Sequence, residues 1–208
     1  MRIEFLSSNS DRSGKYLLKF EDGSSMRLYR QTVEDFGLYN GMELDSAQLS
    51  DLRIAAGQMS AKMRAVRIVS ATSVSKADLE QRLIQKGEQP EQAREAVAWM
   101  AELDLVDDQK TAEQIVARCV SKGYGRSRAK QELYEKRIPK QYWDVALENY
   151  PDQEDALIRF LQNRLPEDPS PKDVKRAVDA LIRRGHSWSA IRNALSQITQ
   201  EADYFQED

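Results

Sequence analysis

The sequence predicts a mainly α-helical protein, in which three tandem three-helix repeats follow a small α+β module with a β-hairpin. The first observation behind this prediction is a helical pattern that occurs three times. Its central leucines, Leu83, Leu133 and Leu181, are 50 and 48 residues apart. A period in this range is typical of stacked helical units. The second observation is that β-prone runs are confined to the first 56 residues or so.

The N-terminal module is expected to span residues 1–56. Arg2 to Leu6 has the composition of a short strand. Lys15–Phe20 and Ser25–Tyr29 are β-prone and flank a turn containing Asp22-Gly23, which predicts a hairpin. The other elements expected here are a short helix at Thr32–Phe36 and a second helix capped by Asp45 or Ser46.

Each repeat is expected to contain three helices. In repeat 1, Ala93, Ala96, Val97 and Met100 have the i, i+3, i+4, i+7 spacing of an amphipathic face. The expected helices are 57–72, 75–86 and 90–104 in repeat 1 (57–107), 108–121, 126–136 and 139–149 in repeat 2 (108–150), and 152–165, 171–184 and 188–199 in repeat 3 (151–200), before an acidic tail, 201–208.

Residues typical of helix ends mark several of these boundaries. Ser75 and Ser170 each precede an aspartate by three residues, as in a capping box. Prolines fit first-turn positions, and glycines that follow a lysine or arginine fit left-handed C-terminal caps. The prolines are Pro90, Pro139 and Pro171, and the glycines are Gly87, Gly123 and Gly185.

Composition excludes several classes of protein. No run approaches 18 apolar residues, so no membrane span is expected, and the start has no secretory signal. The single cysteine, Cys119, cannot form an internal disulfide, which favours a cytoplasmic protein. The formal net charge of -3 and the mean hydropathy of -0.68 indicate a heavily solvated surface.

The side chains that most enzymes need are scarce. Cys119 is the only cysteine and His186 the only histidine, whereas a structural zinc site needs about four such ligands. Lys122–Ser127 resembles a phosphate loop but lacks the Gly-Lys-Ser/Thr ending. Cys119 is interpreted as a buried thiol and His186 as a helix-start residue. We therefore expect no enzyme activity, no cofactor and no metal.

One basic cluster is the candidate binding site. Residues 118–137 contain seven basic and two acidic side chains, a net charge of +5. Several of them surround a helix N-terminus, whose backbone N–H groups also attract anions, and cations there oppose the helix dipole. An ordinary solvated face is an equally open interpretation. The candidate residues are Arg118, Lys122, Tyr124, Arg126, Arg128, Lys130 and Lys136.

Other basic and aromatic residues are given structural roles. Arg183 and Arg184, like Arg82 and Lys86, lie near expected helix C-termini, where cations are stabilising without any function. The tryptophans, Trp99, Trp143 and Trp188, are expected to pack between helices.

The middle of the chain resembles the RecX family, regulators of the bacterial RecA recombinase. The resemblance covers about residues 60–197 and is most specific in repeat 2. Three positions depart from the family pattern: Asp104 and Arg137 stand where glycine is usual, and Thr111 where tyrosine is common. The motifs that carry the resemblance are Ser75-X-Ala77-Asp78-Leu79, Lys86-Gly87, Leu105-Val106-Asp107-Asp108, Ala112-Glu113, Lys122-Gly123-Tyr124-Gly125 and Glu132-Leu133.

The resemblance implies a protein that docks in the groove of the RecA filament on single-stranded DNA. Bound there, it would limit filament growth, ATP hydrolysis, strand exchange and coprotease activity. It would act as a monomer and contact single-stranded DNA weakly or indirectly. Two alternatives stay open at this point: a DNA-binding module of the helix-turn-helix type, and a scaffold for an unrelated protein.

Overall fold

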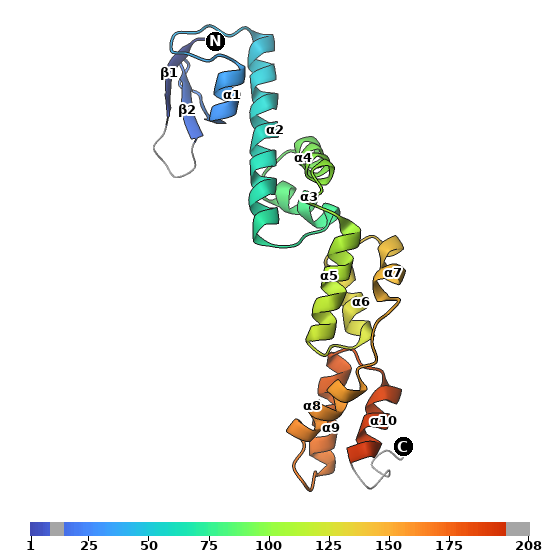
Figure 1. The fold of residues 1–208 in the computed structure, drawn as a ribbon. Helices are drawn as coiled ribbons and strands as arrows, with labels where there is room; N and C mark the ends of the chain where they lie inside the picture. Colours follow the sequence, from blue (N-terminus) through green and yellow to red (C-terminus); the bar gives the residue numbers. More distant parts are fainter. Residues whose placement is uncertain (9–14, 199–208) are drawn as a thin grey trace. The chain divides into compact units, whose positions relative to one another are not determined.

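The computed structural model describes residues 1–8 and 15–198 and divides the chain into two compact units, Met1–Val106 and Asp107–Asp208. The fold class agrees with the prediction, because a small sheet precedes a succession of helices (Figure 1). The predicted acidic tail, 201–208, lies outside the described residues. Among the described helices, none has the length and apolarity needed to cross a membrane.

The first unit begins with an antiparallel sheet in the order β1-β2-β3. Its strands are β1 (Ile3–Ser8), β2 (Lys15–Phe20) and β3 (Ser25–Tyr29), so the predicted hairpin is confirmed. Gly23 takes a φ of 83° in its turn, a conformation that glycine adopts without strain. The buried side of the sheet packs on the helices that follow.

Two helices complete the core of the module: α1 (Arg30–Asp35) and α2 (Ser46–Ala71). Asp45 caps α2 in a capping box with Gln48, in agreement with one of the two predicted caps. The helix is continuous, so it runs through the boundary expected between residues 56 and 57. Leu52 near its start belongs to the core of the sheet, and Ala61 and Ala65 belong to the core of repeat 1.

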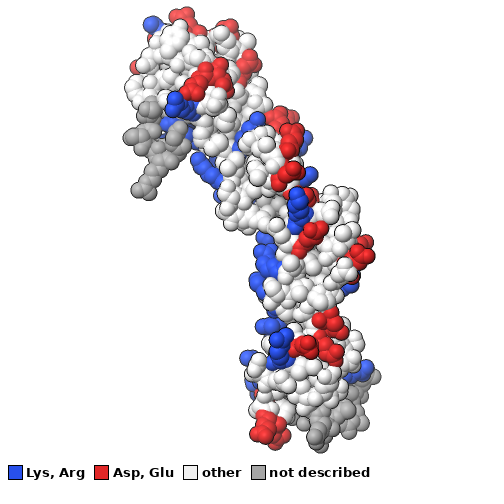
Figure 2. Space-filling view, in the orientation of Figure 1, with Lys and Arg blue, Asp and Glu red and all other residues white. Residues whose placement is uncertain are grey.

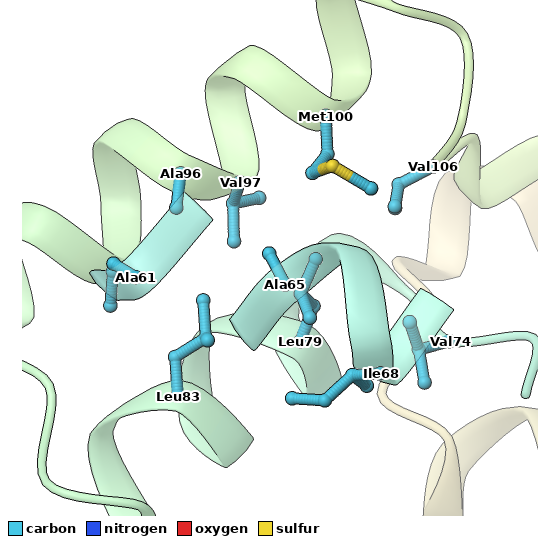
Figure 3. Packing of buried hydrophobic residues seen from close by; sticks show 11 residues of the cluster. Ala61, Ala65, Ile68, Val74, Leu79, Leu83, Ala96, Val97, Met100 and Val106 are labelled. Atoms are coloured by element: carbon cyan, nitrogen blue, oxygen red, sulfur yellow. The ribbon is translucent and has the colours of Figure 1, made fainter. Parts of the chain in front are cut away.

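Repeat 1 packs α2 against α3 (Lys76–Gln85) and α4 (Pro90–Glu102). The face predicted from spacing is the buried face of α4. Figure 3 shows Val97 of α4 directed toward Ala65 of α2, and the side chain of Met100 beside Val106. Burial of such side chains contributes most of the stability of a small helical unit.

The second unit holds two more three-helix groups. The first consists of α5 (Asp108–Ser121), α6 (Arg126–Glu135) and α7 (Trp143–Leu147), with a 3-10 turn, η1 (Lys140–Tyr142), before α7. The second consists of α8 (Glu154–Arg164), α9 (Pro171–Arg183) and α10 (Trp188–Ile198). Each group encloses its own apolar cluster.

The threefold sequence pattern is the packing pattern of the repeats. Leu83, Leu133 and Leu181 are at most 1% exposed, each in the core of its own repeat. Gly87, Gly123 and Gly185 all have positive φ, which confirms the predicted left-handed caps.

The third helix of repeat 2 is shorter than predicted. A helix was expected at 139–149, but the structure contains η1 and then the five residues of α7. Tyr150 follows α7, and its hydroxyl donates to the carbonyl of Tyr124 at 2.6 Å. Pro151 restricts only the backbone of Tyr150, so the early end of the helix at Leu147 goes with this contact to the turn before α6.

Candidate functional site

The structure places the seven candidate residues around α6. Arg118 lies in the last turn of α5, and Lys122 is the C-cap residue of that helix. Arg126, Arg128 and Lys130 lie in the first half of α6. Tyr124 is in the turn between the two helices, and Lys136 is the C-cap residue of α6.

The N-terminus of α6 abuts the C-terminus of α9 from repeat 3. The backbone N–H of Gly125 donates to the carbonyl of Arg184 at 2.9 Å, and that of Ser127 donates to Gly185 at 3.3 Å. The predicted anion-binding helix start is therefore wrong for these two donors, because carbonyls of the same chain occupy them. The basic side chains there also lie beside the negative end of α9, which offsets their opposition to the dipole of α6.

This contact depends on glycine. Gly125 has a φ of -78° and a ψ of 163°, a conformation that any residue adopts, so its backbone does not require glycine. A Cβ at this position would lie well inside van der Waals contact of the Gly185 carbonyl oxygen. A Cβ on Gly185 would in turn overlap the backbone nitrogen of Arg128. The two turns can approach this closely only without side chains.

Two side chains add hydrogen bonds across or beside the same contact. Nε2 of His186 lies 3.0 Å from the carbonyl oxygen of Gly123, a partner 63 residues away. His186 is therefore more than the helix-start residue that was predicted, since it links repeats 2 and 3. Burial raises the pKa of Tyr150 to about 12, so its hydroxyl keeps the proton that it donates to Tyr124.

The surroundings of His186 predict a pH dependence of stability. Burial lowers its pKa below the ordinary 6.5, so the folded protein takes up the proton less readily than the unfolded chain. The contribution of His186 is then complete above the ordinary pKa and is lost as pH falls through the lower folded value. The urea midpoint should fall more between about pH 7.5 and about pH 5.5 in the wild type than in His186→Gln. An equal fall in both proteins would assign the effect to carboxyl groups.

A hollow of about 300 Å³ lies beside the contact between α6 and α9. Repeat 2 contributes Tyr124 and Arg128 to its lining, and repeat 3 contributes Ala180, Arg183 and Arg184. Arg183 and Arg184 were predicted to be helix-end residues only, so the sequence missed their convergence with Arg128. One indication of this contact was present in the sequence: the N-cap residue of α6 is Gly125, where a residue with a capping side chain is usual.

Neighbouring side chains hold two of these guanidinium groups in place. Arg128 pairs with Glu132 one turn along α6, at 2.6 Å. The guanidinium carbon of Arg184 lies 4.6 Å from the centre of the Phe160 ring. The Nζ of Lys122 lies 5.9 Å from the centre of the Tyr124 ring. Ordered cations lose less conformational entropy when an anionic partner binds.

The remaining candidates do not converge on the same point. Arg126 and Lys130 line a second hollow of about 480 Å³, together with His186 and the segment before α8. Arg118 and Lys136 line neither of the two hollows. In Figure 2, Lys and Arg side chains gather along the left edge of the part of the second unit that holds α5–α7. The cluster is thus a basic surface around a repeat junction rather than one pocket.

Cys119, the single cysteine of the sequence, belongs to the apolar core of repeat 2. Cys119 is 3% exposed, and burial raises the pKa of its thiol, as expected for an apolar packing residue. In residues 1–8 and 15–198, no three His, Cys, Asp or Glu side chains gather in a metal-binding arrangement. The features that the basic surface does present are cations beside aromatic rings.

Comparison with known sequences identifies relatives of this chain. Residues 107–147 match a family model described as "RecX, second three-helix domain". Regulatory protein RecX of Chlorobaculum tepidum is 30% identical over 145 residues, which cover 68% of this chain and 90% of that protein. Regulatory protein RecX of Vibrio campbellii is 29% identical over 147 residues, which cover 69% of this chain and 95% of the relative.

Solved structures show the same fold. A crystal structure of regulatory protein RecX superposes with a TM-score of 0.63 at 19% identity, over 92% of this chain and 98% of the other. The structure of RecX from Lactobacillus salivarius gives a TM-score of 0.58 at 21% identity, over 69% of this chain and 97% of that chain.

Proposed function

The chain belongs to the RecX family of regulatory proteins, and from this premise we propose that it restrains the RecA recombinase. It does so without a catalytic step, by binding in the groove of the filament that RecA forms on single-stranded DNA. The bound protein contacts neighbouring RecA subunits, limits filament growth, and so lowers ATP hydrolysis, strand exchange and coprotease activity.

The observation that carries the proposal is the basic surface at the junction of repeats 2 and 3. It brings Arg128 of α6 and two arginines of α9, Arg183 and Arg184, to one hollow. A nucleoprotein filament presents many negative charges, and complementary charge accelerates and orients association.

The junction suits this role because it fixes the spacing between two sets of cations. Backbone hydrogen bonds from Gly125 and Ser127 tie α6 to the turn after α9. Arrays of helical repeats offer long surfaces on which several weak contacts act together. Filament subunits recur at a regular spacing, so a rigid junction can contact two of them without an added entropy cost.

Cosedimentation tests this proposal. RecA filaments assembled on long single-stranded DNA should carry the protein into the pellet, whereas the same DNA without RecA should carry much less. A salt titration separates the two cases, because direct DNA binding falls steeply with salt in proportion to the phosphates contacted. Equal recovery with and without RecA would favour a DNA-binding module instead, and absence from both pellets would refute the proposal.

A further inference from the structure

A third hollow, with a different chemistry, lies at the other end of α6. It has a volume of about 580 Å³, within the ~300–1,000 Å³ usual for ligand sites. The end of α6, the segment that follows it and the first residue of α7 form it. Its lining residues are Tyr134, Glu135, Arg137, Ile138, Pro139, Lys140 and Trp143. None of these lines either hollow at the junction of repeats 2 and 3.

An arginine occupies a strained backbone position in this hollow. Arg137 has a φ of 55°, in the left-handed region where a Cβ is unfavourable and glycine is not. Its N–H donates to the carbonyl of Tyr134 at 2.9 Å, which closes the turn after α6. A glycine would make the same turn without the strain, so the turn itself does not explain the arginine. Strained residues of this kind are concentrated at functional sites.

Two aromatic side chains of the hollow, Tyr134 and Trp143, are accessible to a ligand. Tyr134 is 71% exposed, more than any other large hydrophobic side chain in the described part of the chain. Trp143 is half-buried, and its indole Nε1 donates to the carbonyl of Ile138 at 2.9 Å, which fixes the orientation of its ring. An exposed ring beside an oriented one offers flat apolar surface at little entropy cost.

The charges in the hollow select for an anionic ligand. Arg137 and Lys140 are both exposed and line it together with the two rings. Glu135 is the one carboxylate of the lining, and it accepts a hydrogen bond from Gln131 at 2.8 Å, one turn back along α6. Paired rings and cations match a ligand that presents flat aromatic groups and negative charge in alternation.

We propose that this hollow is a binding site for an unpaired nucleotide of single-stranded DNA. One base stacks on Tyr134, and Trp143 forms the wall of the hollow. Arg137 and Lys140 contact the flanking phosphates. An acidic protein segment is the less favoured ligand, because it would leave the ring of Tyr134 without a stacking partner. The inference goes beyond the proposed function, which requires no direct contact of this chain with DNA.

Fluorescence anisotropy with a labelled oligothymidine of about 20 nucleotides tests the site in the full-length protein. Tyr134→Ala should weaken binding about tenfold, since it removes the aromatic ring on which the base stacks. Arg137→Gly should raise the melting temperature because it relieves strain, and should weaken binding with a salt slope shallower by about 1. A stabilised protein with lower affinity is not the result of a structural role alone.

Asp104→Gly is the matched control. Asp104 also has a φ of 55°, in the turn after α4 of the first unit. Its replacement should raise the melting temperature in the same way and leave oligothymidine binding unchanged. In a Trp99→Phe/Trp188→Phe background, where Trp143 is the only tryptophan, the oligonucleotide should also quench the fluorescence.

Three results would overturn the inference: no binding of the oligonucleotide by the wild type, unchanged affinity in both Tyr134→Ala and Arg137→Gly, or equal displacement of the oligonucleotide by polyglutamate. Cosedimentation of the same variants with RecA filaments keeps the two proposals apart. If the protein binds RecA filaments but does not bind free DNA, the nucleotide site is refuted and the proposed function is not.

Discussion

Replacing Gly125 with alanine should weaken the docking of repeat 3 on repeat 2 by roughly 2–4 kcal/mol. The new Cβ would meet backbone atoms of Gly185, which cannot rotate away as a side chain does. Overpacking typically costs ~1–3 kcal/mol, and each hydrogen bond lost at the junction costs ~0.5–1.5 kcal/mol. Each repeat keeps its own apolar cluster, so the helices should remain folded while the junction opens.

Hydrogen exchange of the backbone amides at the junction of repeats 2 and 3 measures this loss of docking. In Gly125→Ala, the amides of residues 125 and 127 should exchange faster, because those of Gly125 and Ser127 donate across the junction in the wild type. Gly57→Ala is the matched control: its Cβ would meet the flexible side-chain end of Gln92, and alanine is favoured by ~1 kcal/mol inside a helix. Unchanged exchange in Gly125→Ala would show that the close approach is not needed for docking.

Reversing three charges on α6 should abolish most of the inhibition of RecA. Arg126→Glu/Arg128→Glu/Lys130→Glu places like charges where a negative filament would approach, and we expect at least a roughly tenfold loss of affinity, mainly through slower association. Helix α6 should persist, because acidic residues near a helix start are favoured by the dipole. RecA-dependent ATP hydrolysis as a function of protein concentration, with circular dichroism, measures both expectations.

A variant with the same change in net charge controls for this experiment. Lys172→Glu/Lys175→Glu/Arg176→Glu alters three exposed cations in the first half of α9, away from its contact with α6. It should inhibit RecA about as well as the wild type. If both triple variants lose inhibition to the same extent, net charge alone is responsible and the basic surface has no special role.

Much of the fold could be predicted because its information is local. The spacing of Leu83, Leu133 and Leu181 reports which side each helix buries, and all three side chains are in apolar cores. Asp22-Gly23 and the left-handed glycines likewise have meaning within a few residues of themselves. Such features depend on the neighbours along the chain, so one sequence is enough to identify them.

The interrupted helix and the continuous α2 show where local information is insufficient. The run from Pro139 to Asn149 has helical composition, but the hydrogen bond from Tyr150 to Tyr124 joins its end to the turn before α6. Helix α2 spans Ser46–Ala71 because its two halves pack on different cores. Both outcomes depend on contacts between residues far apart in sequence.

The candidate site was predictable in charge but not in arrangement. The net charge of residues 118–137 located the basic surface, yet Arg183 and Arg184 reach it only because α9 ends against α6. For Arg137, the sequence already identified the unusual position, and the structure supplies its geometry. Its place where glycine is usual in the family was visible in the sequence, and the structure adds the positive φ that makes this choice costly.

The central claim is that this chain restrains RecA through binding to its filament, and DNA-dependent ATP hydrolysis by RecA tests it most directly. RecA should hydrolyse ATP on single-stranded DNA more slowly as this protein is added. Inhibition should be stronger when the protein is present during filament assembly than when it is added afterwards, because we propose that filament growth is the step that it limits. An unchanged rate at a molar excess of the protein over RecA would contradict the account.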